Sequence, residues 1–168
     1  GFEQVLRAFR ENFEHNDEVG ASVCLTRHGK PVIDLWGGLR DADTGAEWER
    51  DTISLVYSCT KGATALCAHM LVDQGKLDYN ARVVDLWPEF AAGGKTDTTV
   101  AMMLGHTSPV PHLREPIKTG GLTDWEYMAE RVALEPAFWE PGTRQGYHGL
   151  TYAWTVGNLV RLAAGMPL

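Results

Sequence analysis

The stretch VYSCTKG, residues 56–62, places Ser58 three residues before Lys61. Apolar residues from 60 to 74 recur at the period of an α-helix, and Gly75 is a suitable helix stop. Side chains three residues apart lie on the same face of a helix, so the amine of Lys61 can reach the hydroxyl of Ser58. A serine becomes a good nucleophile only when a neighbouring group takes its proton. The pair therefore indicates a candidate nucleophile with an activating amine.

The same pair also has a purely structural interpretation. Ser58 would then cap the helix, and Lys61 would be a solvated side chain. If Ser58 begins the helix and is catalytic, its backbone N–H is free and the helix dipole favours negative charge there. Gly62 leaves room for another segment to approach. Cys59 has no matching base at a suitable spacing, so we do not assign it as the nucleophile.

Bulk composition limits the function classes. The chain has 168 residues, of which 44% are hydrophobic and 22% charged, as in ordinary globular proteins. A net charge of −7 argues against a nucleic-acid partner. No apolar run approaches the roughly 18 residues that span a bilayer, and residues 1–15 are amphipathic with acidic side chains, unlike a signal peptide. We therefore expect a cytoplasmic protein with no membrane partner.

Cysteine and histidine usage predicts no metal site. Cys24, Cys59 and Cys67 are odd in number and lack metal-type spacing, which favours free thiols in a reducing compartment. The six histidines form no His-x-His or His-Glu-x-x-His pair. We expect neither a metal nor a cofactor.

The order of predicted elements is that of an α+β protein. Two apolar runs joined at His28-Gly29-Lys30 predict a β-hairpin, and the polar segment 40–52 predicts a loop. Helical periodicity is found in residues 2–15, 60–74, 123–135 and 151–164. Helix, antiparallel strands and then mostly helices make up this order.

These motifs together resemble the serine β-lactamase and penicillin-binding-protein superfamily, most closely its class C-like carboxylesterases. The resemblance is carried by Ser58-x-x-Lys61, by the hairpin ending in DLWGG, by ALCAHMLVDQGKLDYNARVVDLWPEF and by TVAMMLGHTSPVP. It implies a β-lactamase/transpeptidase-like fold without its C-terminal strands. The implied organisation is one partial domain over 1–168, with the helix and strands in 1–57 and the nucleophile helix and mainly helical region in 58–168.

The resemblance also implies a tyrosine facing the serine as general base. In PGTRQGYHGLTYAW, Tyr147 follows Pro141-Gly142 at the position of that loop. Lactam-hydrolysing relatives have Tyr-x-Asn, whereas this chain has Tyr147-His148-Gly149, and the missing amide favours ester chemistry. A buried aromatic with a satisfied hydroxyl is the alternative interpretation of Tyr147. Tyr152 is expected in the core.

The family's third motif, Lys-Thr-Gly or a substitute, is not found after Tyr147. Lys118-Thr119-Gly120 matches its letters but precedes the tyrosine, so we interpret it as a loop. Trp36-Gly37-Gly38 is likewise interpreted as structural.

These observations predict a serine hydrolase acting on a small-molecule ester or amide through an acyl-enzyme. The predicted catalytic residues are Ser58, Lys61 and Tyr147, and the predicted substrate contacts are Trp139, His148 and Gly149. A D-amino-acid peptidase, a weak β-lactamase and a non-catalytic scaffold remain the alternatives. An exposed sheet edge would favour self-association or pairing with a C-terminal segment.

Overall fold

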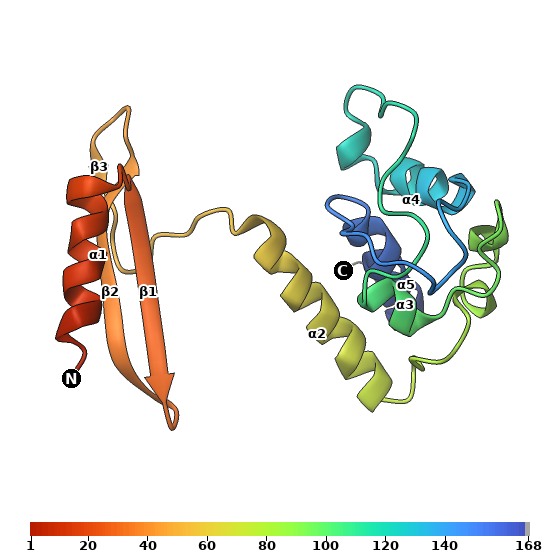
Figure 1. Ribbon diagram of the computed structural model, residues 1–168, viewed down its shortest axis with the longest axis horizontal. Helices are drawn as coiled ribbons and strands as arrows, with labels where there is room; N and C mark the ends of the chain where they lie inside the picture. Colours follow the sequence, from red (N-terminus) through yellow and green to blue (C-terminus); the bar gives the residue numbers. More distant parts are fainter. Residues whose placement is uncertain (167–168) are drawn as a thin grey trace. The chain divides into compact units, whose positions relative to one another are not determined.

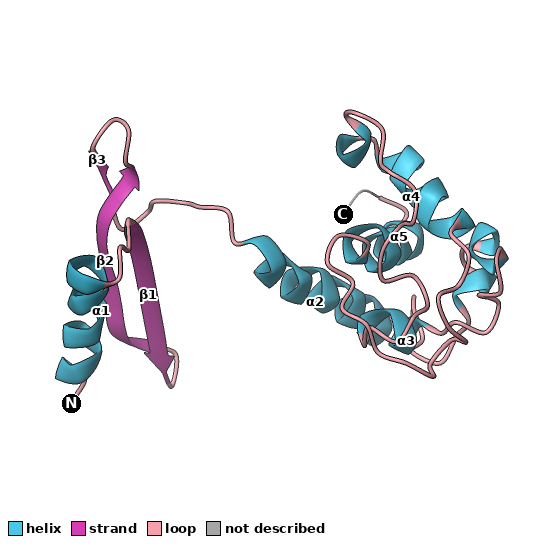
Figure 2. Cartoon of the chain, turned by 45° about the horizontal axis from the view of Figure 1, so that its top comes forward, coloured by secondary structure: helices cyan, strands magenta, loops and turns pink. Residues whose placement is uncertain are grey.

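The computed structural model describes residues 1–166, and the chain divides into two compact units, Gly1–Leu55 and Val56–Leu168 (Figure 1). The first unit contains the strands and the second is helical (Figure 2). The boundary between them lies two residues before the predicted one at 57/58. That the two make up a single domain stays a prediction.

The first unit is a helix and an antiparallel sheet. Its elements are α1 (Glu3–His15), β1 (Gly20–Arg27), β2 (Lys30–Asp41) and β3 (Ala46–Glu47), in the sheet order β1-β2-β3. His28 and Gly29 both have positive φ, as a two-residue hairpin turn requires, and the predicted hairpin is confirmed. The predicted loop 40–52 is interrupted by β3, which is too short for a period to show in the sequence.

The second unit is built from helices around α5. Its α-helices are α2 (Thr60–Asp73), α3 (Val100–Leu104), α4 (Trp125–Leu134) and α5 (Tyr152–Ala164), with short 3₁₀ turns at Tyr57–Cys59, Val83–Asp85, Pro88–Ala91 and Gly121–Thr123. The four helices predicted from periodicity are confirmed, and α3 was not predicted. No helix within residues 1–166 combines the length and apolar character needed to cross a membrane.

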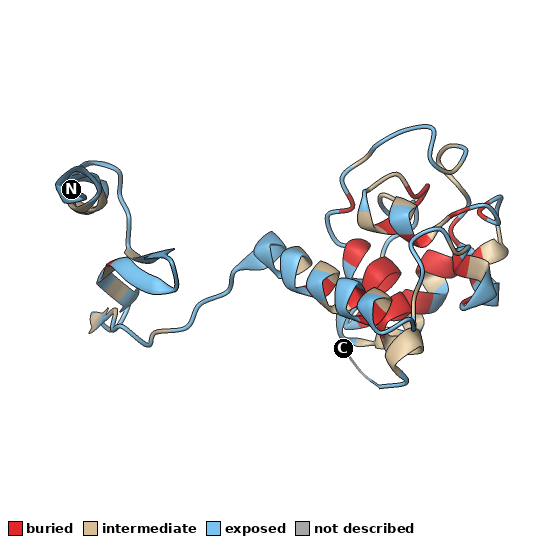
Figure 3. Cartoon of the chain, turned by 90° about the horizontal axis from the view of Figure 1, so that it is seen from below, coloured by how far each residue is buried: buried red, intermediate tan, exposed pale blue. Residues whose placement is uncertain are grey.

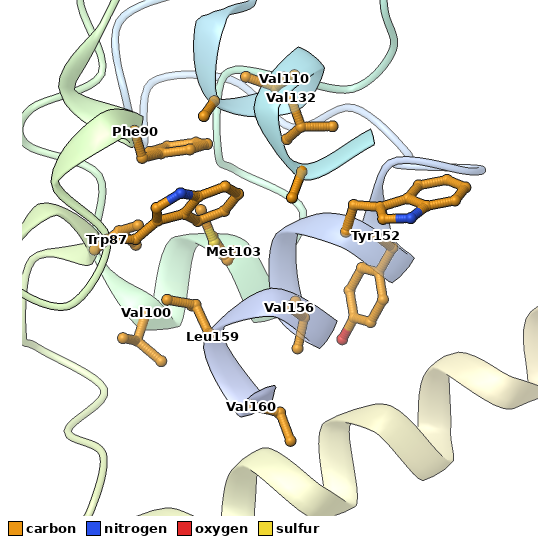
Figure 4. Close-up of a cluster of buried hydrophobic side chains, with 14 of the residues drawn as sticks. Trp87, Phe90, Val100, Met103, Val110, Val132, Tyr152, Val156, Leu159 and Val160 are labelled. Atoms are coloured by element: carbon orange, nitrogen blue, oxygen red, sulfur yellow. The ribbon is translucent and has the colours of Figure 1, made fainter. Parts of the chain in front are cut away.

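The core of the second unit surrounds α5, whose residues 154–160 are all buried (Figure 3). This helix packs against α2, α3 and α4. Trp87, Phe90, Met103 and Leu159 fill the space among these elements (Figure 4). Because α5 is fixed on several sides, the segment just before it has a rigid support.

The chain enters α2 through the 3₁₀ turn, and Ser58 lies in that turn rather than in the α-helix. Tyr57 has a positive φ of 41°, which bends the chain into the turn. At the other end, the N–H of Gly75 donates to the carbonyl of Val72, and that of Lys76 to the carbonyl of Leu71. These bonds form a Schellman motif with Gly75 at φ 69°, which confirms Gly75 as the helix stop.

Candidate active site

Ser58 and Lys61 lie together at the start of α2. The Lys61 ammonium donates to Ser58 Oγ at 3.1 Å and to the carbonyl of Gly149 at 2.8 Å. The second bond joins α2 to the segment that precedes α5, 88 residues later in the chain. Lys61 is therefore not the freely solvated side chain of the structural alternative, because both contacts fix its amine at Ser58.

Tyr147 lies beside the same amine. Lys61 Nζ is 4.9 Å from the centroid of the Tyr147 ring. The Ser58 hydroxyl, followed by the Lys61 ammonium, lowers the pKa of the Tyr147 phenol from its ordinary value of 10.0. The Tyr147 side chain is 61% exposed, so its interpretation as a buried aromatic is wrong. A hydroxyl, an amine and a phenol thus meet on one surface of the second unit.

Tyr152 is a core residue, as expected. Its side chain is 3% exposed, and burial raises its pKa. The centroid of its ring lies 5.8 Å from Lys61 Nζ, so the ring is part of the surroundings of the amine.

The segment carrying Tyr147 is bound to the residues that follow α3. The N–H of Gly146 donates to the carbonyl of His106 at 3.1 Å, and the N–H of His148 donates to His106 Nδ1 at 3.2 Å. His148 Nε2 and the hydroxyl of Ser108 are 2.8 Å apart. Burial lowers the pKa of His148 to about 4.

Two of the three predicted substrate contacts do not reach the surface beside Ser58. His148 is fully buried, and its ring nitrogens face Ser108 Oγ and the carbonyl of Gly146. Trp139 packs against Gly146, and its indole N–H donates to the carbonyl of Thr107. Both residues contact Gly146 in the segment that carries Tyr147, and residue spacing in the sequence did not predict these contacts.

Gly149 is the predicted contact that lies at the site, because its carbonyl holds Lys61. A Cβ at this position would meet no atom within 4 Å. The site is therefore open on the side where lactam-hydrolysing relatives were expected to carry an amide.

Two pockets adjoin these residues. One of about 240 Å³ contains Ser58 and Lys61, and one of about 550 Å³ contains Tyr147 and the loop 111–117. Gly149 and Leu150 line both pockets. Sequence reasoning missed Leu150 and the loop 111–117, although Pro111 and Pro116 mark the loop as rigid.

The wall of the larger pocket offers no free cation from Arg114. One of its nitrogens donates to Glu135 Oε1 and to the carbonyl of Pro136, and its guanidinium lies 3.6 Å from the centroid of the Phe138 ring. Glu135 is 6% exposed, so Arg114 is fixed to a buried carboxylate. The arginine holds the loop in place, and its charge is already paired with Glu135.

The other sequence candidates lie in structural roles. Lys118 pairs with Asp124 at 2.9 Å, and Gly120 has a φ of 76°, as expected for a turn. Within the described residues, His, Cys, Asp and Glu side chains do not gather in threes that would hold a metal ion.

Comparison with known proteins gives consistent matches along the chain. Residues 4–168 match the protein family described as Beta-lactamase. Esterase/beta-lactamase LipL of Mycobacterium tuberculosis is 35% identical, over 99% of this chain and 38% of that protein. The crystal structure of a family VIII carboxylesterase is similar with a TM-score of 0.91 and 43% identity, over 98% of this chain and 44% of that one.

A penicillin-binding protein homologue from Caulobacter crescentus is also similar, with a TM-score of 0.93 and 32% identity over 99% of this chain and 45% of that one. The chain thus spans less than half the length of these relatives. The predicted fold class is confirmed, with the strands of the N-terminal part and the helical region present.

Proposed function

The chain belongs to the beta-lactamase family, and from this premise we propose that it carries the nucleophilic centre of a serine hydrolase for carboxylic esters. Ser58 is the nucleophile, Tyr147 the general base and Lys61 the cation that supports the base. The observation that carries this proposal is the bond from Lys61 Nζ to Ser58 Oγ, beside the exposed phenol of Tyr147.

In the proposed reaction, Ser58 Oγ forms a bond to the ester carbonyl carbon while its proton passes to the oxygen of Tyr147. The tetrahedral intermediate collapses, the ester C–O bond breaks, and the leaving alkoxide takes the proton back. Water then attacks the acyl carbon of the acyl-enzyme and gives its proton to the Tyr147 phenolate. The second tetrahedral intermediate collapses, the bond from the acyl carbon to Ser58 Oγ breaks, and Oγ takes the proton from Tyr147 as the acid leaves. No metal or cofactor is needed to balance these steps.

Electrostatics favour Tyr147 as the proton acceptor. The Lys61 amine is committed to the carbonyl of Gly149, which can only accept a hydrogen bond. A positive amine beside the ring stabilises a phenolate, in line with the lowered pKa of Tyr147.

Apolar side chains line much of the larger pocket. Leu113, Ile117, Met128 and Leu150 supply apolar surface, while Arg114 is already paired. Its volume of about 550 Å³ lies within the usual range for small-molecule pockets. We propose that an apolar acyl or alcohol group of the ester lies there, beside Tyr147.

A fluorescent alkyl phosphonate tests the nucleophile directly. We expect covalent labelling at Ser58, no label in Ser58→Ala, and strongly reduced labelling in Tyr147→Phe. The neighbouring Cys59→Ala is the matched control, because it removes the adjacent reactive side chain and should label normally. A folded chain that takes no label and cleaves no short-chain ester would favour the non-catalytic scaffold.

β-Lactam hydrolysis is the second candidate, since LipL is named as both esterase and beta-lactamase. A chromogenic cephalosporin distinguishes the two reactions. We expect ester turnover to exceed cephalosporin turnover, because Gly149 supplies no side-chain amide. Fast cephalosporin turnover would contradict the expectation that ester turnover is the faster reaction. Release of a D-amino acid from a D-peptide would identify the peptidase alternative.

A further inference from the structure

The two backbone N–H groups that flank Tyr147 both donate hydrogen bonds to His106. The N–H of Gly146, just before the tyrosine, donates to the His106 carbonyl at 3.1 Å. The N–H of His148, just after it, donates to His106 Nδ1 at 3.2 Å. A single residue thus fixes the backbone on either side of Tyr147, although it lies more than forty residues earlier in the chain.

The partners of the two histidines assign their protons. His106 Nδ1 accepts a backbone N–H, so it carries no hydrogen. His148 Nδ1 is 2.7 Å from the carbonyl of Gly146, which only accepts, so this nitrogen carries the hydrogen. Its Nε2 is therefore the acceptor for the Ser108 hydroxyl at 2.8 Å.

Both rings are neutral in this arrangement. Burial, followed by the nearby Lys61 ammonium, lowers the pKa of His106, and burial lowers that of His148 to about 4. The two Nδ1 atoms are 3.3 Å apart, and of the two only that of His148 carries a hydrogen. The network from Ser108 through His148 to His106 is thus fixed in one proton arrangement.

The His106 ring also contacts the phenol that it holds. Its centroid lies 5.1 Å from that of Tyr147 and 4.9 Å from that of Tyr152. Because Tyr152 belongs to the buried part of α5, the ring of His106 packs between the core and the exposed tyrosine. The His106 backbone has a φ of 61°, the left-handed conformation that orients the residue in this way.

We infer that His106 is the positioning residue of the Tyr147 phenol, with His148 and Ser108 fixing the orientation of the loop that carries it. This inference rests on the proposed function of Tyr147 as the base. His106 acts through Tyr147 and needs no contact with the substrate. Without its side chain, the Tyr147 segment loses the bond from the His148 N–H and the packing of one ring face, while the bond from the Gly146 N–H to the backbone carbonyl remains.

Two variants at His106, with Tyr147→Phe as the baseline, separate the contributions of the acceptor and the ring. His106→Asn keeps a side-chain oxygen near the place of Nδ1 and tolerates the left-handed backbone. His106→Gly keeps the backbone conformation but removes the acceptor and the ring. Tyr147→Phe supplies the baseline, because the difference in near-ultraviolet absorbance against it reports the ionisation of the Tyr147 phenol alone.

The expected result is a shift of the phenol and a loss of turnover. In His106→Gly the phenol should titrate near the ordinary pKa of about 10, because it no longer lies against Ser58 and Lys61. Ester kcat should fall by about 100-fold with KM little changed, as for a misplaced catalytic group. His106→Asn should restore most of both quantities.

The outcomes distinguish this inference from the proposed function. If the wild-type phenol titrates low and His106→Gly raises it, but no variant cleaves esters, positioning stands and the hydrolase proposal fails. If folded His106→Gly keeps the wild-type phenol pKa and kcat, the inference is overturned. If His106→Asn has the same phenol pKa and kcat as His106→Gly, the role of Nδ1 as the acceptor is overturned. If His106→Gly does not fold, Ser108→Ala takes its place: a partial shift in phenol pKa supports the network, and an unchanged value overturns it.

Discussion

At the scale of single residues, the protonation of His148 makes the stability of the folded chain depend on pH. Its folded-state pKa of about 4 lies below the ordinary value of 6.5, because burial disfavours the imidazolium. The unfolded chain therefore binds more protons between these two values, and stability rises with pH across that window. The contribution is fully present above about pH 6.5 and is lost as the pH falls through about 4.

We expect the wild-type chain to lose on the order of 2 kcal/mol of unfolding free energy through this one group between about pH 6.5 and 4. His148→Gln removes the titrating ring, so its stability should depend less on pH over the same window. Urea unfolding followed by circular dichroism at several pH values measures the difference. Equal pH slopes for the two proteins would contradict the assignment.

Leu150 is the residue whose size should control substrate choice, because it lines both pockets and is 61% exposed. In Leu150→Trp we expect kcat/KM for long-chain esters to fall while acetate esters are retained. For the wild type, kcat/KM should rise about fourfold for each methylene that enters the larger pocket. Ala153→Trp is a control that lines the smaller pocket alone. If Leu150→Trp does not change how kcat/KM depends on the length of the ester's carbon chain, the proposal that the substrate occupies the larger pocket is wrong.

At the scale of elements, Gly62 inside α2 and Gly75 just beyond its end have opposite roles. A Cβ on either Gly62 or Gly75 would meet no atom within 4 Å, so neither substitution creates a clash. Gly75 has a φ of 69° beyond the helix end, whereas Gly62 lies inside the helix without a positive φ. Only backbone conformation therefore distinguishes them.

We expect Gly75→Ala to destabilise the chain by about 1 kcal/mol, because a left-handed conformation is unfavourable for alanine. Gly62→Ala should stabilise it by about 0.5–1 kcal/mol, because alanine is the better helix former. Thermal unfolding of both variants and of the wild type measures the sign of each change in stability. A loss of stability in Gly62→Ala would mean that another segment packs against this position, which was the expectation from sequence.

The helices with a clear apolar period could be predicted, and the shortest elements could not. α3 has five residues and β3 has two, so each is too short for its pattern to recur. Spacing placed Ser58 near Lys61 because one helical turn joins them, but only family resemblance brought Tyr147 to the same place. Burial of His148 could not be read from spacing, because it depends on which groups bind its ring nitrogens.

At the scale of the whole molecule, one face of α2 is not covered by the other helices of the second unit. Leu66 is 59% exposed and Met70 54%, and they lie four residues apart on one face of the helix. We expect the isolated chain to self-associate through this apolar face despite its net charge of −7. Sedimentation velocity should show concentration-dependent dimers that Leu66→Lys with Met70→Glu abolishes. A wild-type chain that remains monomeric at all concentrations would contradict this and leave pairing with a further segment as the proposal.

The two compact units differ in how much apolar surface they bury. Within residues 1–55, Ile33 is the one buried side chain, at 8% exposure. The large buried cluster belongs to the second unit, and it runs from Ala68 to Val160. A small sheet covered on one side by a single helix is marginal on its own, because it buries too little area to offset the entropy of ordering its chain.

We therefore expect residues 56–168 alone to unfold cooperatively and residues 1–55 alone to show little stable structure. Circular dichroism and urea titration of the two fragments test this, with the full chain as reference. The 56–168 fragment should also keep the lowered pKa of Tyr147, because Ser58, Lys61 and His106 all lie within it. A fragment that folds but whose phenol titrates as an ordinary tyrosine would show that the first unit is needed to assemble the site. That result would contradict a site built from the second unit alone.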